Sequence, residues 1–199
     1  MTSRTVVHAT VLACFTMGVA VVLAAFNTLT SKDIARRAGE DLQASLEQVI
    51  PPAIHDNDLT GDVLRLTDGG RTVVVYRARK DGQPTAFAYE AAATGYAGEV
   101  RLIMGVDTTG RLLGVRVVSH HETPGLGDRI EAEKTGWIGR FAGLSLGDPP
   151  EEKWAVKKDG GQFDQFSGAT ITPRAVVGAI RQGLRFFAAR RAEMMETNG

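Results

Sequence analysis

The sequence predicts an α+β protein, in which an apolar N-terminal helix precedes a domain that packs helices against an antiparallel sheet. Three observations lead to this prediction. Residues 6–26 are almost wholly apolar, several segments after residue 72 are rich in β-branched side chains, and residues 172–195 repeat apolar side chains at helical spacing. Strands joined by short turns, with helices outside them, are typical of the α+β class.

The composition of the chain narrows the classes of function. Its 199 residues suffice for one domain with an appended segment. It has 23 basic and 23 acidic side chains, so the net charge is zero and the basic surface that nucleic acid requires is missing. Cys14 is the single cysteine, which excludes an intrachain disulfide and a cysteine-ligated metal cluster. We therefore expect no nucleic-acid partner and no iron–sulfur centre.

The apolar segment Val6–Phe26 predicts a transmembrane anchor within residues 1–27. About 20 helical residues span the hydrocarbon core of a bilayer, so the lipid bilayer is an expected partner. A cleaved signal peptide is one alternative, but its apolar region would run only about 7–15 residues. A lipoprotein signal at Cys14 is another, but the apolar run continues well past that cysteine. The length of the run favours an uncleaved anchor.

A second helix is predicted after the anchor, as a linker over residues 28–52. Ser31 can act as its N-cap, and Pro51 with Pro52 ends it. Its apolar side chains recur at steps of three and four residues: Ile34, Ala38, Leu42, Leu46 and Val49. Residues 53–199 then form the folded domain.

Four strands are predicted in the first half of this domain. The first is rich in β-branched residues, and the four cover Thr72–Arg79, Thr85–Ala93, Glu99–Asp107 and Leu112–His120. Their connections are short, and short connections join antiparallel neighbours. The strands therefore predict one antiparallel sheet.

The second half of the domain predicts helices and a hairpin. Asp128–Phe141 has the spacing of a helix, and Trp154–Lys157 with Gln162–Phe166 flank a turn as a hairpin would. The last helix runs from Thr172 to about Met195. Thr172 is expected to cap it and Pro173 to occupy its first turn.

Two motifs carry the chemistry. Residues 164–170 read Asp-Gln-Phe-Ser-Gly-Ala-Thr, and residues 121–127 read His-Glu-Thr-Pro-Gly-Leu-Gly. Taken alone, the first is a helix start and the second a rigid turn. In this order, and after a membrane anchor, they give the chain a resemblance to the G subunit of the Rnf ion-translocating electron-transport complex, a family that carries covalent FMN.

The resemblance implies the site residues. Thr170 would join the FMN phosphate as a phosphodiester, and Asp164 would be recognised by a separate flavin transferase. Non-covalent contacts would come from both motifs: Ser167, Gly168, Ala169, Glu122, Thr123, Leu126 and Gly127. A helix N-terminus suits a phosphate because its backbone N–H groups are free. No residue is expected to be catalytic, and no metal ligand is predicted.

The resemblance also implies the function. The chain would relay electrons through covalent FMN, as one subunit of an oxidoreductase that couples ferredoxin and NAD redox chemistry to ion translocation. Its partners would be the other membrane and redox subunits, without which it completes no turnover. One alternative is a component like the C subunit of the sodium-pumping NADH:quinone oxidoreductase, which shares both motifs. Another is an anchored binding domain without redox function.

The location implied by the resemblance is the bacterial inner membrane, crossed once, with the domain on the periplasmic side. The charges beside the anchor point weakly the other way. Lys32, Arg36 and Arg37 follow the apolar segment, and the positive-inside rule would then favour a cytoplasmic domain. Long domains translocate largely regardless of such counts, so the periplasmic side is the prediction.

Overall fold

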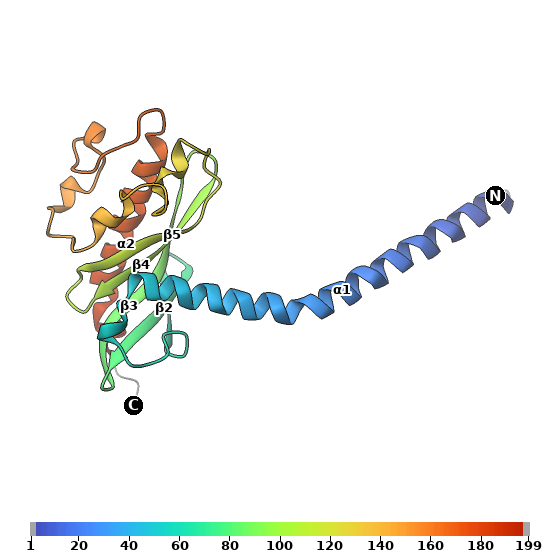
Figure 1. Cartoon of the computed structure of the whole chain (residues 1–199), viewed down its shortest axis with the longest axis horizontal. Coiled ribbons are helices and arrows are strands. Elements are labelled where there is room, and N and C mark those ends of the chain that lie inside the picture. The colour runs from blue at the N-terminus through green and yellow to red at the C-terminus, as the bar shows by residue number, and fades with distance from the viewer. Residues whose placement is uncertain (1–2, 197–199) are drawn as a thin grey trace. The chain divides into compact units, whose positions relative to one another are not determined.

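The computed structural model describes residues 3–196, and Figure 1 shows its helices and strands. The chain separates into two compact units, Met1–Leu42 and Gln43–Gly199. The first unit is formed by most of helix α1 (Ser3–Val49), and the second contains the end of α1, the sheet and helix α2 (Ile171–Met195). The side chains of Lys32, Ile34 and Ala38, used above, lie outside the described part of the structure.

Helix α1 has the surface of a membrane span. Its segment Val6–Ser31 is long and apolar enough to cross a bilayer, and none of it is buried. Large apolar side chains such as Leu12, Phe15 and Phe26 are more than 60% exposed. Its threonine hydroxyls donate to carbonyls three or four residues earlier, which satisfies these polar groups without water. This segment is therefore suited to a lipid environment.

The prediction that a separate linker helix begins at Ser31 is wrong. Helix α1 continues without a break from Ser3 to Val49. The Ser31 hydroxyl donates to the carbonyl of Thr28 at 3.1 Å, so it bonds within the helix and caps nothing. The predicted end is confirmed, because the helix ends at Val49, one residue before Ile50 and Pro51.

The domain is built on one antiparallel sheet in the order β1-β2-β3-β4-β5. The strands are β1 (Val63–Asp68), β2 (Arg71–Lys80), β3 (Gln83–Thr94), β4 (Glu99–Asp107) and β5 (Leu112–Ser119). The last four confirm the predicted strands. The sequence analysis missed β1, since only Leu66 of this edge strand is buried.

The two faces of the sheet are covered by different helices. Helix α2 packs on one face, where apolar side chains of the sheet and the helix form the main core: Phe87, Tyr89, Leu102, Met104, Val176, Ile180 and Leu184. The end of α1 meets β4 and β5 at two glycines. A Cβ atom on Gly105 would lie 2.2 Å from the carbonyl oxygen of Val49, and one on Gly114 would lie 3.2 Å from its Cα. These glycines let the helix approach the sheet backbone closely.

The helix predicted over Asp128–Phe141 is wrong. Two 3-10 turns stand there instead, η2 (Gly127–Ile130) and η3 (Ile138–Phe141). Between them, the Thr135 hydroxyl donates to the carbonyl of Arg129 at 2.6 Å and accepts the N–H of Trp137 at 3.2 Å. Such side-chain bonds replace the backbone bonds that a helix would need.

The hairpin predicted over residues 154–166 is also wrong. The short turn η4 (Glu151–Lys153) precedes this segment, the turn η5 (Lys157–Asp159) lies within it, and a parallel bridge joins Val156 to Phe163. Five aromatic rings pack against one another here, in stacked, tilted and edge-to-face pairs: Trp137, Phe141, Trp154, Phe163 and Phe166. Ring packing, which depends on segments far apart in the sequence, decides the backbone path here.

Candidate functional site

The two sequence motifs meet at the N-terminus of α2. Loop 121–127 leaves the end of β5, and segment 164–170 leads into the helix. The Thr172 hydroxyl donates to Glu122 Oε2 at 2.5 Å, which joins the two. A cavity of about 250 Å³ lies between them, lined by Tyr96, Glu122, Thr123, Leu126, Gly127, Gly168, Ala169, Thr170, Ile171 and Thr172.

Thr170 occupies the N-cap position of α2, and its side chain is half-buried. Its hydroxyl makes no capping bond and no other hydrogen bond within residues 3–196. The first helical bond runs from the Arg174 N–H to the Thr170 carbonyl at 3.3 Å. The N–H groups of Ile171 and Thr172 therefore have no helical partner, as at any helix start. The result is a free hydroxyl beside free amide donors.

The capping role predicted for Thr172 is wrong. This residue is the second residue of the helix, is fully buried, and bonds to Glu122. Pro173 lies in the first turn, as predicted. A buried hydroxyl takes the nearest strong acceptor, and here that acceptor comes from 50 residues earlier in the chain.

Glu122 is buried with both carboxylate oxygens in use. Oε2 accepts the Thr172 hydroxyl, and Oε1 accepts the N–H of Ala97 at 3.1 Å. Two glycines make room for it: a Cβ atom on Gly95 would lie 2.3 Å from Oε1, and one on Gly127 would lie 2.5 Å from Oε2. Glu122 thus ties the β3–β4 turn, its own loop and α2 together, while its side chain also lines the cavity.

A second set of polar contacts stabilises loop 121–127. His120 Nδ1 accepts the N–H of Glu122 at 3.0 Å. Its Nε2 lies 3.0 Å from Glu131 Oε1. Lys134 contacts both Glu131 and Asp128, and its hydrogen bond is the largest cause of a lowered pKa at each of these carboxyls. Within residues 3–196, no three His, Cys, Asp or Glu side chains form a metal site.

The rim of the cavity is apolar and exposed. Tyr96, Leu126 and Ile171 are 72%, 44% and 45% exposed. Beyond helix α1, the described residues include one further exposed large apolar side chain, Val118. Gathered apolar groups on a surface mark a binding site. The sequence analysis missed Tyr96 and Ile171. A tyrosine between two glycines, Gly95 and Gly98, in a strand-connecting turn was the available signal for Tyr96.

Ser167 and Asp164 lie outside the lining of this cavity, unlike the other predicted site residues. Ser167 is exposed. Asp164 forms ion pairs with Arg140 at 2.5 Å and Lys157 at 2.6 Å. Lys157 first, and then Arg140, hold the pKa of its carboxyl below the usual range. Its backbone carbonyl accepts the indole N–H of Trp137 at 2.8 Å. Asp164 thus belongs to the outer surface of the segment.

These features fit a bound FMN. The amides of a helix start suit the charge of the phosphate, and the apolar rim suits the flavin ring. A family model described as "FMN-binding domain" matches residues 95–185, a range that contains every residue lining the cavity. The fold and site therefore define a flavoprotein of the FMN-binding-domain class.

Relatives narrow the class to one family. The G subunit of the ion-translocating oxidoreductase complex of Cereibacter sphaeroides is 50% identical over 194 residues, covering 97% of this chain and 89% of the relative. The protein of the same name from Stutzerimonas stutzeri is 48% identical and covers 84% and 74%. The chain belongs to this family of G subunits. It is an FMN-containing electron-transfer subunit of an ion-translocating oxidoreductase, and its apolar helix anchors it in the membrane.

A solved structure supports the fold alone. The crystal structure of NqrC from Shewanella oneidensis aligns with a TM-score of 0.50 at 22% identity, covering 75% of this chain and 73% of that one.

Proposed function

We propose that the chain carries FMN as a phosphodiester on Thr170 and relays electrons through it. The observation that carries this proposal is the free Thr170 hydroxyl, which lines the cavity where both motifs meet. A bound flavin supplies transfer of one or two electrons. The residues of the chain hold it, orient it and limit its contact with water.

The start of α2 provides for the phosphate charge. A phosphodiester on Thr170 would face the amide N–H groups of Ile171 and Thr172 and the positive end of the helix dipole. The first cationic side chain of the helix, Arg174, is already held by both carboxylate oxygens of Asp159, at 2.5 and 2.8 Å. We infer that backbone dipoles, more than a side-chain cation, neutralise the phosphate.

The apolar rim provides for the flavin ring. Tyr96, Leu126 and Ile171 come from three separate segments and leave an exposed apolar surface beside Thr170. Covering this surface with the ring removes apolar area from water.

The redox partners of the chain and its maturation are inferred from the family. We propose that the complex couples ferredoxin and NAD redox chemistry to ion movement, and that a flavin transferase reads Asp164 while it loads Thr170. The relatives, which are G subunits of an ion-translocating oxidoreductase, favour this role over one in a sodium-pumping NADH:quinone oxidoreductase.

The test of attachment is Thr170→Ala. Co-expressed with a flavin transferase, this variant should show no flavin fluorescence in a denaturing gel. Its unfolding free energy should change by only about 1 kcal/mol, because the hydroxyl has no bond to lose. Ser167→Ala is the matched control, since it removes another hydroxyl of the same turn and should stay fluorescent. Retained fluorescence in Thr170→Ala would refute the assignment.

We also propose that the domain faces the periplasm. Protease added to intact spheroplasts should digest the domain and leave a small membrane-bound fragment that contains Val6–Ser31. A domain that resists protease until the membrane is opened would place it in the cytoplasm, as the charges after the anchor suggest.

A further inference from the structure

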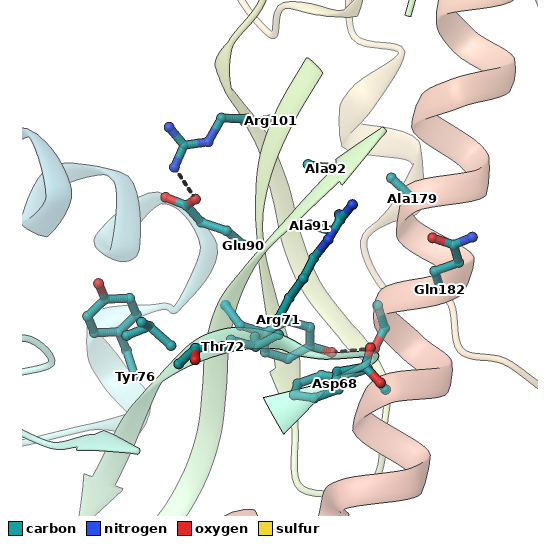
Figure 2. Close-up of a pocket in the computed structure, with 15 residues that line it drawn as sticks. Asp68, Arg71, Thr72, Tyr76, Glu90, Ala91, Ala92, Arg101, Ala179 and Gln182 are labelled. Carbon is teal, nitrogen blue, oxygen red and sulfur yellow. Dashed lines mark hydrogen bonds and ion pairs between the residues drawn. The ribbon is translucent and has the colours of Figure 1, made fainter. Parts of the chain in front are cut away.

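Strands β2 and β3 separate at one end and leave a cleft between them. They pair from Lys80 with Gln83 as far as Val75 with Tyr89, and no further. Each strand keeps its other neighbour over the remaining length: β2 pairs with β1 as far as Arg71, and β3 pairs with β4 as far as Thr94. The cleft has a volume of about 450 Å³, and helix α2 lies along it (Figure 2).

Two strand edges face each other across this cleft. The Arg77 N–H donates to the carbonyl of Asp62 on the β1 side, so alternate residues of β2, Thr72 and Val74, direct their backbone groups toward β3. By the same alternation, the bond from the Gly95 N–H to the Gly98 carbonyl on the β4 side leaves Glu90, Ala92 and Thr94 directed toward β2. These residues present backbone donors and acceptors that the sheet does not use.

The side chains around these edges leave the backbone accessible. Ala91, Ala92, Ala179 and Gly183 contribute small or absent side chains. Native proteins usually protect an exposed edge with proline, lysine or a bulge. The free edge of β3 reads Glu-Ala-Ala-Ala-Thr over residues 90–94 and has none of these. An open edge of this kind favours the addition of another strand.

The charged side chains of the cleft indicate the charge of the segment that it binds. Glu90 is paired with Arg101 at one rim. The side chain of Arg71 has no ion pair or hydrogen bond within the described residues, and Figure 2 shows it extending across the cleft toward Ala91 and Ala179. A free guanidinium over a strand edge is complementary to a carboxylate.

We propose that this cleft binds an extended segment of another subunit of the complex, which pairs with the edge of β3 and places an acidic side chain against Arg71. The segment would add a strand at the open end of the sheet. This inference rests on the membership of the chain in a multisubunit complex and not on flavin attachment at Thr170.

The test is residue-resolved amide hydrogen exchange of the full chain, in detergent alone and in the assembled complex. The amides of Glu90, Ala92 and Thr94 should exchange at least about tenfold more slowly in the complex. Those of Ala91 and Ala93, already paired with β4, should change little. Equal exchange in both samples would overturn the proposal. So would concentration-dependent protection of the chain alone, because a second copy would then fill the cleft.

Two charge-matched variants sharpen the test. Arg71→Glu should reduce recovery of the protein with the complex several-fold, while Arg65→Glu, an exposed position on β1, should not. Flavin fluorescence of both variants in a denaturing gel should match the wild type, which separates this proposal from the proposal about Thr170. Equal recovery of both variants would exclude the role of Arg71 in binding.

Discussion

The two motifs each contribute one acidic residue, and these two residues differ in their burial and in the charge of their partners. Glu122 is buried at 5% exposure and accepts bonds from two uncharged donors. The Asp164 side chain is 43% exposed and lies between the two cations Arg140 and Lys157. A buried carboxylate without a cation is held only by its hydrogen bonds, so its contacts must persist. An exposed ion pair adds little stability and leaves its carboxylate accessible. The comparison indicates that Glu122 positions the site and that Asp164 is available for recognition.

The largest effect should come from Glu122→Ala. This change leaves the Ala97 N–H and the Thr172 hydroxyl without an acceptor and opens a gap between three segments. We expect the unfolding free energy to fall by about 3 kcal/mol. Chemical denaturation of the full chain in detergent measures this.

Glu122→Gln is the control, because an amide can accept from Ala97 and donate to Thr172. It should lose far less stability and keep its flavin. If both variants unfold equally easily, the negative charge matters more than the hydrogen bonds, and the assigned positioning role is wrong.

The next largest effect should come from Asp164→Ala, which we expect to reduce flavin loading without changing the stability of the fold. Co-expression with the transferase should give less flavin per chain, while the denaturation midpoint and circular dichroism spectrum stay unchanged. Arg140→Gln and Lys157→Gln test how Asp164 acts. If the transferase contacts the carboxylate directly, both variants keep their flavin. If they lose flavin as Asp164→Ala does, the ion pairs organise the segment and the contrast with Glu122 weakens.

The smallest expected effect is a change in the pKa of Asp164. Lys157 and Arg140 hold the pKa of Asp164 below its ordinary value of 3.8. A lowered pKa in the folded state means that the stabilising contribution is present above the unfolded pKa and is lost as the pH falls through the folded one. Replacing both cations by glutamine should raise the pKa of Asp164 toward 3.8, as a carboxyl titration by NMR would show. An unmoved pKa would mean that the two ion pairs do not form in solution.

Local patterns in the sequence predicted the elements that bury a regular face. Strands β2 to β5 and helix α2 follow from side-chain periodicity, and the anchor follows from an unbroken apolar run. The two motifs identified Thr170, Glu122 and Leu126 as site residues, and the structure brings all three to one cavity. Periodicity succeeds here because it reports which face of an element is buried.

Only the tertiary structure decided the rest. In the folded chain Thr172 bonds to Glu122 and does not cap the helix, and Tyr96 lines the cavity. The predicted helix over Asp128–Phe141 is replaced by two short turns. The tertiary structure also separated β2 from β3 beyond Val75. In each case the deciding contact joins residues that are distant in the chain or depends on side chains competing for backbone groups. Local sequence preferences do not predict such contacts, because the contacts form only when the segments meet.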